Sequence, residues 1–309
     1  MQRFARLVKA LDKNMQRRYE SMGILKNRVD MVGYITVKNS NLNGDIDMEN
    51  MPRMDAEGYG FATDVCLKRS IRDNVALLYP DRTGYGIYIL NDNTALETKV
   101  NKCISELDEV NKKDLKGVKG GNKIKEVLCQ QYFDIRAFGA VITGLSKIPG
   151  ADGQLLGPVA VTFAESLEPI DPQQLTISRV SIQTEKDLER KSQESGKKWV
   201  VPYAVYRFEV HVSAAVSEKT GFTEEDLEVL IEAIRSMYEN MHTSAKTDIS
   251  LSNLYVFRHK SKLGNCPMRK LSSAIRVEKI TPEIGREYYH ITLDEGKVPE
   301  GVSVEKYED

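Results

Sequence analysis

The chain has 309 residues, of which 41% are hydrophobic and 29% are charged, and its formal net charge is −1. This hydrophobic content supports a packed core and excludes a disordered chain, and no run of 18 apolar residues indicates a membrane span. The N-terminus is charged and unlike a signal peptide, so we expect a cytoplasmic protein that is not secreted and has no membrane partner.

In the first part of the chain, the sequence predicts a helix, a strand and a loop. Residues 3–19 place apolar side chains on one stripe of a basic helix, which could cap the core, contact a neighbouring copy or touch nucleic acid. The β-formers of 29–37 predict the first strand. Residues 38–62 follow as a long polar loop, and loops of this length are commonly functional.

The helix that begins near Thr63 combines a core stripe with basic residues. Its apolar positions recur with helical spacing, as a helix face turned to a core requires. Lys68, Arg69 and Arg72 lie beside that stripe and form a cationic ridge. Thr63 or Asp64 caps the first turn, whose free N–H groups point back toward the loop. A solvated helix face and a phosphate-binding surface both fit this pattern.

The rest of the chain reads as strands and helices with polar insertions. We expect strands at 86–90, 136–143, 159–164, 176–184, 199–215 and 254–257, and helices over 96–110 and 223–241. Together with the loop 38–62, the expected insertions are 112–123, 144–157 and 185–198. The order approximates β-α-β-β-α-β, so we predict an α+β fold with the ferredoxin-like arrangement of RNA-recognition domains.

Charge is separated along the chain despite the small net value. Residues 1–22, 111–125 and 258–270 are basic, whereas 223–241 and 281–309 are acidic. Such separation can build one positive groove on a neutral molecule, or let the acidic face of one copy meet the basic face of the next in a head-to-tail filament.

Residues that could perform catalysis or bind metal are sparse. The four cysteines are far apart, which indicates reduced thiols, and the four histidines have no metal-ligand spacing. No Walker loop, G-x-S-x-G sequence or paired catalytic carboxylates occur, so we expect no cofactor, no metal and no enzymatic activity. The loop 39–50 has Asn and Asp near the ligand spacing of a calcium loop, but it lacks Asp at position 1 and Glu at position 12. A calcium-dependent adaptor is therefore an alternative.

Several blocks of sequence closely resemble the backbone subunit of type I-C CRISPR surveillance (Cascade) complexes. Three of them surround the loop and the basic helix: NLNGD (41–45), NMPRMD (50–55) and TDVCLKR (63–69). Six more follow in order, at 132–141, 157–159, 162–164, 177–179, 201–203 and 254–259. Leu42 and Ile46 stand where the family pattern has proline.

The resemblance implies a non-catalytic, hand-shaped scaffold with a ferredoxin-like palm and inserted finger and thumb segments. Residues 27–280 would form one RNA-binding domain, preceded by a basic helix (1–26) and followed by an acidic tail (281–309). Several copies would line a guide RNA and present it to target DNA, together with other Cascade subunits. The residues implied in RNA binding are Asn41, Asn43, Gly44, Arg53, Lys68, Arg69, Arg72, Arg136, Phe138, Gly139 and Arg179.

Two of these positions also fit structural roles, and one alternative function remains open. Phe138 could stack on a base and Gly139 could let a nucleic-acid backbone approach, although a strand Phe is commonly a core residue. Asp45 and Asp47 follow the first strand, where type III relatives carry an acidic loop residue that supports cleavage of bound RNA. A metal-dependent ribonuclease is therefore the leading alternative, and the calcium-dependent adaptor is the second.

Overall fold

The computed structural model describes residues 23–106, 117–142, 145, 153–178, 195–240, 242–282, 284–285 and 287–308. The expected N-terminal helix, Arg179 and much of the expected insertions 144–157 and 185–198 lie outside these residues. Within the described ranges, every helix is too short or too polar to span a lipid bilayer.

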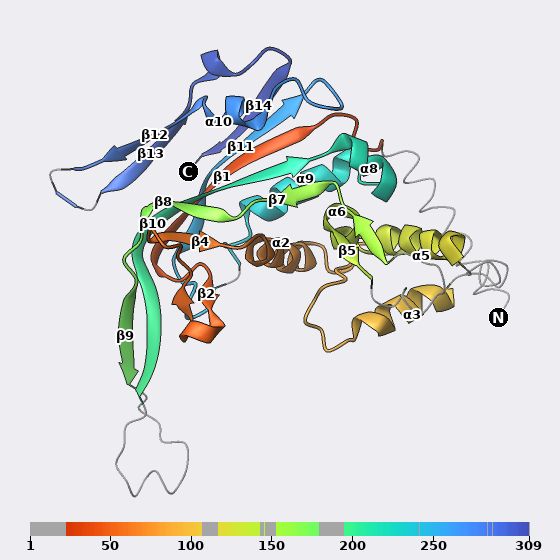
Figure 1. Cartoon of the computed structure of the whole chain (residues 1–309), viewed down its shortest axis with the longest axis horizontal. Helices are drawn as coiled ribbons and strands as arrows, with labels where there is room; N and C mark the ends of the chain where they lie inside the picture. Colours follow the sequence, from red (N-terminus) through yellow and green to blue (C-terminus); the bar gives the residue numbers. More distant parts are fainter. Residues whose placement is uncertain are drawn as a thin grey trace, which may run out of the picture.

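An eight-stranded antiparallel sheet forms the centre of the molecule (Figure 1). The long strand β1 (Val29–Ser40) lies between β10 (Ser195–Val212) and β11 (Ile249–His259). The strand order is β14-β11-β1-β10-β8-β4, and β7 and β9 also pair with β10. The bounds of these strands are β4 Tyr59–Ala62, β7 Val159–Val161, β8 Ala164–Pro169, β9 Gln173–Ser178 and β14 Val302–Glu308.

Both faces of the central sheet are covered, which explains why the sequence of β1 is apolar without alternation. On one face, Met31 and Ile35 belong to the main core, with α2 (Asp64–Leu78) and α9 (Glu224–Arg235) packed over them. On the other face, Val32 and Tyr34 form a second core. The elements of that side are α10 Met268–Ser272, β12 Ile275–Ile280, β13 Tyr288–Leu293 and η3 Glu295–Lys297.

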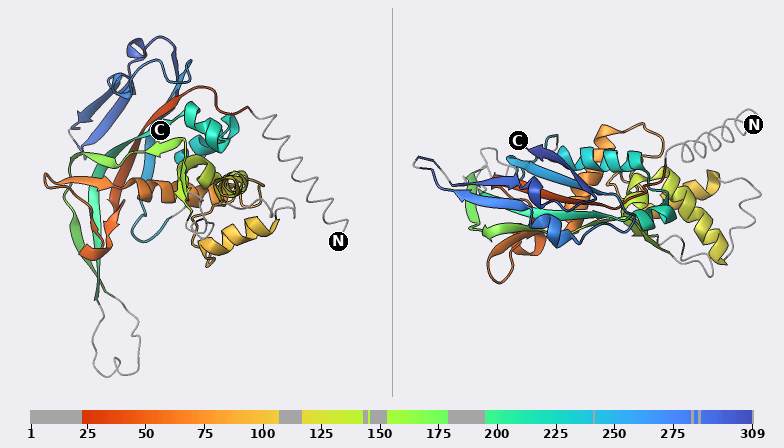
Figure 2. Two further views of the ribbon diagram at one scale, coloured as in Figure 1. Left: turned by 45° about the vertical axis from the view of Figure 1, so that its right-hand side comes forward. Right: turned by 90° about the horizontal axis from the view of Figure 1, so that it is seen from above.

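A helical lobe lies beside the sheet and has its own small core (Figure 2). Its elements are α3 Leu96–Glu106, α5 Gly117–Gln131, α6 Phe133–Phe138, β5 Gly139–Val141 and β6 Gln154–Leu156. The short helix α8 (Ala214–Thr220) lies next to α5 and follows β10 directly. Val100, Ile124 and Leu128 are among the buried residues of this lobe.

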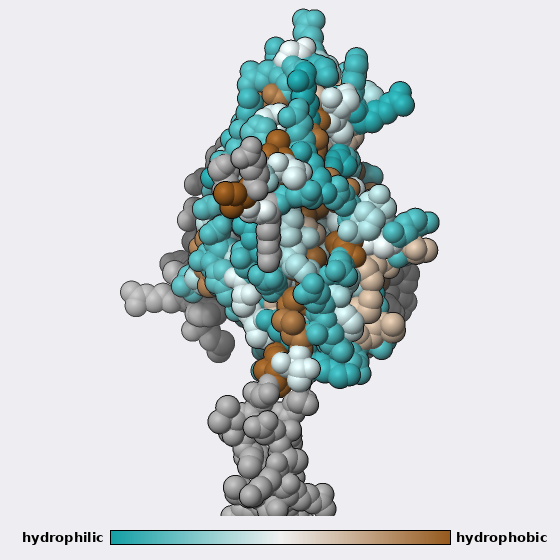
Figure 3. All heavy atoms as spheres, turned by 90° about the vertical axis from the view of Figure 1, so that its left-hand side faces the viewer, coloured by the Kyte–Doolittle hydropathy of each residue, from teal (hydrophilic) through white to brown (hydrophobic). Residues whose placement is uncertain are grey.

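The paired strands β9 and β10 extend beyond the sheet as a projecting ribbon (Figure 1). The pairing runs from Gln173 opposite Val200 to Ser178 opposite Ser195. Leu175 is 46% exposed on this ribbon. Figure 3 shows this side of the molecule, where hydrophobic side chains gather close to the ribbon. The ribbon therefore presents apolar surface outside the main cores.

The predicted mixture of helix and sheet is confirmed, but several local predictions are wrong. Residues 86–90 form no strand, because the Asp134 carboxylate accepts the N–H groups of Tyr88 and Ile89 at 2.7 and 3.0 Å. Residues 136–138 belong to helix α6 rather than to a strand. Residues 117–123, expected to be flexible, form the first turns of α5.

Two regions expected to be irregular also contribute regular structure. The loop 38–62 contains β2 (Gly44–Asp45), η1 (Ile46–Met48), β3 (Met51–Pro52) and β4. The segment expected to be an acidic tail supplies β13 and β14. The pairing of β14 with β11 extends from Asn253–Glu308 to His259–Val302, so this segment forms an edge of the central sheet.

Candidate nucleic-acid interface

The first turn of α2 is tied to the loop that follows β1. The Thr63 hydroxyl accepts the Cys66 N–H at 3.2 Å and caps the helix. The Asn43 side-chain oxygen accepts the Thr63 N–H at 3.1 Å. The predicted cap is confirmed, and Asn43 fixes the loop against the positive end of the helix dipole.

The loop itself is a small hairpin shaped by two of the predicted residues. Asn41 is 5% exposed, and its side-chain nitrogen donates to the Asn50 carbonyl at 2.6 Å. A Cβ at Gly44 would lie 2.8 Å from the same carbonyl oxygen, so a larger side chain would displace the hairpin. Arg53 pairs with Asp45 at 3.0 Å on the outer surface. Asn41 and Gly44 therefore set the loop conformation, whereas Arg53 stays partly exposed.

A cavity of about 420 Å³ lies between this hairpin, α2, the end of α9 and the segment before β11. Its lining residues are Asn43, Thr63, Val65, Cys66, Arg69, Ser70, Asp73, Met237, Tyr238, Thr243 and Lys246. Arg69 and Lys246 are the cations of this set, and Asp73 is its acid. The cavity therefore joins two of the predicted RNA-binding residues, Asn43 and Arg69, to a basic residue that sequence reasoning missed.

Lys246 reaches the cavity because of the sheet topology. The segment before β11 runs beside the end of β1, where the Asn41 N–H donates to the Ala245 carbonyl at 2.8 Å. The Ser40 hydroxyl accepts the Asp248 N–H at 3.0 Å. The sequence predicted a strand from residue 254, whereas β11 begins at Ile249. The prediction therefore did not show that the segment before β11 lies beside the end of β1.

The electrostatics of the cavity centre on Cys66. Burial raises the pKa of the Cys66 thiol, and the positive charges of Lys246 and Arg53 oppose that shift. The Lys246 Nζ lies 3.9 Å from the Cys66 Sγ. The thiol therefore remains protonated at neutral pH, so it does not neutralise the two neighbouring cations.

Arg69 is the most accessible cation of the predicted ridge. Its side chain is 49% exposed, and its Nε donates to the Asp73 carboxylate at 2.6 to 2.7 Å. A guanidinium carries five N–H donors, so an exposed Arg with this partner can still donate to a phosphate. Arg69 and Lys246 together therefore give the cavity a basic opening toward solvent.

The expected cationic ridge divides into two surfaces of α2. Arg72 is buried, and its Nε donates to Asp134 at 2.9 Å. The guanidinium carbon of Arg72 lies 5.1 Å from the centre of the Phe138 ring. Lys68 also lies over that ring at 5.8 Å and pairs with Asp64 at 3.0 Å. A buried carboxylate holds Arg72, and the Phe138 ring packs against cations of its own chain, so both residues have partners within the fold and their contact with RNA stays a prediction.

Arg136 and Gly139 also have structural roles. Arg136 is 1% exposed and makes a bidentate contact with Asp226, with nitrogen–oxygen distances of 2.7 and 2.9 Å. The Asp226 carboxylate also accepts the Thr223 N–H at 2.9 Å in the capping box of α9. Gly139 has a φ of 72°, and a Cβ there would lie 2.2 Å from the Leu155 carbonyl oxygen. The Arg136 guanidinium is thus held by its own chain, and its contact with RNA stays a prediction. The close approach at Gly139 is to strand β6.

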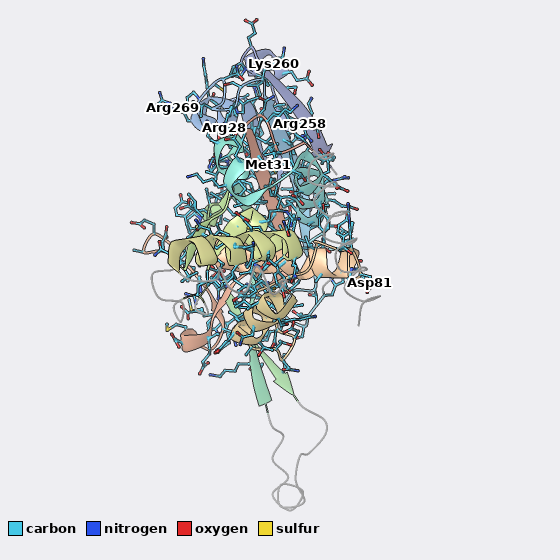
Figure 4. The ribbon with its side chains drawn as sticks, turned by 90° about the vertical axis from the view of Figure 1, so that its right-hand side faces the viewer. Arg28, Met31, Asp81, Arg258, Lys260 and Arg269 are labelled. Carbon is cyan, nitrogen blue, oxygen red and sulfur yellow. The ribbon has the colours of Figure 1, made fainter. Side chains whose placement is uncertain are left out.

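The basic segment 258–270 lies at the opposite end of β1 from the cavity. Figure 4 shows Arg28, Lys260 and Arg269 near the upper end of the sheet in that view. Acidic residues of α8 and α9 meet this segment within one protomer: Arg258 pairs with Glu228 at 2.6 Å, and Lys262 pairs with Glu218 at 2.7 Å. Two of the cations of the basic segment are therefore paired with acids of the same molecule.

Asp45 has protein partners for both of its carboxylate oxygens. One oxygen pairs with Arg53, and the other accepts the Asp47 N–H at 3.1 Å. Within the described ranges, no group of three or more His, Cys, Asp and Glu side chains converges as metal ligands would. Both oxygens of the Asp45 carboxylate are therefore engaged by groups of the same hairpin.

A family model matches most of the chain. The family model described as "CRISPR-associated protein Cas7" matches residues 27–294. No curated protein matches the chain. Among solved structures, a chain of a "CRISPR RNA-guided surveillance complex, pre-nicking" is 15% identical, with a TM-score of 0.47 over 74% of this chain and 78% of that one. A chain of a "CRISPR RNA-guided surveillance complex" is 13% identical, with a TM-score of 0.43 over 74% and 68%.

Proposed function

The chain belongs to the Cas7 family of CRISPR-associated proteins, and from this premise we propose that it is a non-catalytic backbone subunit that binds guide RNA in a cytoplasmic surveillance complex. The ordered sequence blocks between residues 27 and 275 support the finer assignment to the type I-C subtype. The partners in this proposal are the guide RNA, target DNA, further copies of the chain and other Cascade subunits.

The observation that carries the proposal is the basic cavity beside the capped start of α2. Arg69 and Lys246 face the same space, and Asn43 holds the hairpin next to them. Cations and helix N-termini bind phosphates without reading base sequence, which suits a protein that must accept any guide. Arg53, on the outer surface of the same hairpin, extends the basic surface. Asn41 and Gly44 support it through the loop conformation.

The strand order supports the proposed ferredoxin-like palm. The consecutive neighbours β11, β1, β10 and β8 are antiparallel, and helices α2 and α9 follow β1 and β10 in the chain. This is the order 4-1-3-2 of a β-α-β-β-α-β unit when the strands are numbered along the chain. The lobe of α3, α5 and α6 and the ribbon of β9 and β10 are then the inserted segments, which we assign to the finger and thumb.

We propose that guide RNA, rather than charge pairing alone, joins the copies. Arg258 of the basic segment pairs with Glu228 and Glu305 of the two acidic segments within one protomer, so part of that charge is not available to hold a second copy. The purified protein should form larger species when a guide RNA is added. Light scattering of the protein with and without RNA checks this expectation, and an equal small mass in both states would contradict it.

The ribonuclease alternative makes a separate prediction for Asp45. Because its carboxylate is held by Arg53 and by the Asp47 N–H, we expect Asp45→Ala to alter loop geometry and RNA binding but to remove no cleavage. The measurement is an assay of labelled RNA paired to the guide, with magnesium or manganese present. Metal-dependent cutting that disappears in Asp45→Ala would establish the ribonuclease instead. The calcium adaptor is not favoured, since Asn41 turns inward to the Asn50 carbonyl.

A further inference from the structure

The cavity at Arg69 carries more hydroxyl groups than the binding of phosphate by cations requires. Its hydroxyl-bearing lining residues are Thr63, Ser70, Tyr238 and Thr243. Two of these hydroxyls have clear tasks in the fold. The Thr63 hydroxyl caps α2, and the Thr243 hydroxyl accepts the Lys246 N–H at 3.2 Å. Ser70 and Tyr238 are the two whose hydrogen-bonding capacity the fold leaves largely unused.

The Tyr238 side chain, in the turn that follows α9, has an unsatisfied hydroxyl. The side chain is 4% exposed, and its hydroxyl oxygen has no hydrogen-bond partner in the described part of the chain. Burial raises the pKa of Tyr238 well above its ordinary value, so the hydroxyl keeps its proton at neutral pH. Buried hydroxyls are nearly always hydrogen-bonded, so an unpaired one on a cavity wall points to a partner that enters the cavity.

Ser70 supplies a second hydroxyl to the same wall. Its side chain is partly exposed on α2, and its Oγ donates to the Cys66 carbonyl at 3.4 Å. Strong O–H···O bonds span about 2.5–3.0 Å, so this longer bond is weak and readily exchanged for another. Ser70 also lies close enough to Tyr238 to oppose the rise in the pKa of that hydroxyl. The two side chains therefore form a neighbouring pair of hydroxyls.

The contact between α2 and α9 holds this hydroxyl pair in place. Asn74 lies one turn after Ser70 and is fully buried. Its side-chain nitrogen donates to the Ala233 carbonyl and to the Ser236 hydroxyl, both at 2.9 Å. These bonds fix the turn that carries Tyr238 against α2, so the pair is positioned before any ligand binds.

The chemistry of a hydroxyl decides what the pair can recognise. A hydroxyl donates one hydrogen bond and accepts others, whereas Arg and Lys side chains only donate. Phosphate diester oxygens only accept. The ribose 2′-hydroxyl both donates and accepts, and it is the group that distinguishes RNA from DNA. It is attached next to the carbon that carries the 3′ phosphate, so a phosphate at Arg69 and Lys246 would bring a 2′-hydroxyl into the same cavity.

We propose that Ser70 and Tyr238 recognise the ribose of the bound strand, so that this cavity accepts RNA and discriminates against DNA. The 2′-hydroxyl exchanges hydrogen bonds with the two side-chain hydroxyls, while Arg69 and Lys246 bind the adjacent phosphate. The inference rests on the proposed function, since it requires the guide strand to enter the cavity at Arg69. It makes the site selective for the sugar and indifferent to the base.

Fluorescence anisotropy with RNA and DNA strands of one sequence tests this selectivity. The unaltered protein should bind the RNA at least about tenfold more tightly than the DNA, because the net contribution of two hydrogen bonds is lost with the 2′-hydroxyl. Ser70→Ala/Tyr238→Phe should lower RNA affinity by a similar factor and leave DNA affinity unchanged. The variant removes no charge, so the dependence of RNA affinity on salt should stay the same.

A matched control removes the same two kinds of hydroxyl outside the cavity. The Ser217 hydroxyl donates to the Ser213 carbonyl at 2.9 Å, and the Tyr255 hydroxyl donates to the Ile291 carbonyl at 3.2 Å. Ser217→Ala/Tyr255→Phe should keep the preference for RNA but lower the urea midpoint of unfolding. The single change Tyr238→Phe removes a hydroxyl without a partner, so its urea midpoint should not fall.

The possible failures can be told apart. An unchanged RNA preference in Ser70→Ala/Tyr238→Phe would overturn the proposal, and so would an equal loss of affinity for RNA and DNA, which would assign the two hydroxyls to phosphate. Failure of the proposed function has a different result: the unaltered protein would not bind RNA, or its RNA affinity would be the same in Arg69→Ala/Lys246→Ala. That result would overturn both proposals.

Discussion

Replacing Arg136 with Met is expected to lower the free energy of unfolding by about 3–5 kcal/mol, because it leaves the buried Asp226 carboxylate without its partner. Both side chains of this pair are 2% exposed. The guanidinium also donates to the Gly84 carbonyl at 3.1 Å and to the Cys129 carbonyl at 2.5 Å, so one substitution removes contacts to two further parts of the fold. Urea unfolding followed by circular dichroism measures the change.

The control for this prediction is Arg69→Met, which removes a half-exposed Arg whose partner is one helical turn away. Exposed ion pairs of this kind contribute less than about 1 kcal/mol. The double change Arg136→Met/Asp226→Asn should restore part of the loss, since it removes the uncompensated charge as well. Equal destabilisation by Arg136→Met and Arg69→Met would contradict a buried structural role for Arg136.

The double change Arg69→Ala/Lys246→Ala is expected to weaken RNA binding to about the same extent for unrelated guide sequences. Each phosphate contact that is lost should flatten the plot of log K against log salt by about 0.7 for a single strand. Arg69 and Lys246 line the same cavity. We therefore expect the loss of both phosphate contacts to flatten the salt slope of the double variant. Fluorescence anisotropy titrations at several salt concentrations provide the measurement.

A control of equal charge is available on the opposite part of the molecule. Lys262 and Arg276 are 46% and 57% exposed, and each pairs with an acidic residue. Lys262→Ala/Arg276→Ala should leave the salt slope unchanged. If the cavity variant kept the slope of the unaltered protein, Arg69 and Lys246 would be solvated surface residues, and if affinity fell for one RNA sequence alone, they would be reading bases.

Sequence patterns that lie within a single helix or strand were sufficient to predict several main elements of the fold. The β-formers from Val29 and the apolar spacing after Thr63 predicted β1 and α2, and the acidic turn after Thr223 predicted α9. The segment 134–138 was misread because its conformation depends on distant partners. Its β-like residues form a helix in which Asp134 and Arg136 are buried against other parts of the fold.

The candidate site was predictable only where it lies within one stretch of sequence. Asn43 lies in the loop after β1 and Arg69 lies in α2, and both line the cavity. Burial of Arg72 could not be foreseen, because its carboxylate partner is 62 residues away, and the partner of Arg136 is 90 residues away. Lys246 was missed because only the pairing of β1 with β11 brings the segment before β11 beside the hairpin.

Photo-crosslinking of a thiouridine-containing guide RNA, read by peptide mass spectrometry, tests the central claim most directly. The account predicts crosslinks to the peptides around Asn43, to the first turns of α2 at Arg69, and to the segment that contains Lys246. These crosslinks should be lost with excess unlabelled RNA and reduced in Arg69→Ala/Lys246→Ala. Crosslinks confined to the basic segment 258–270, at the far end of β1, would contradict the assignment of this cavity to the guide RNA.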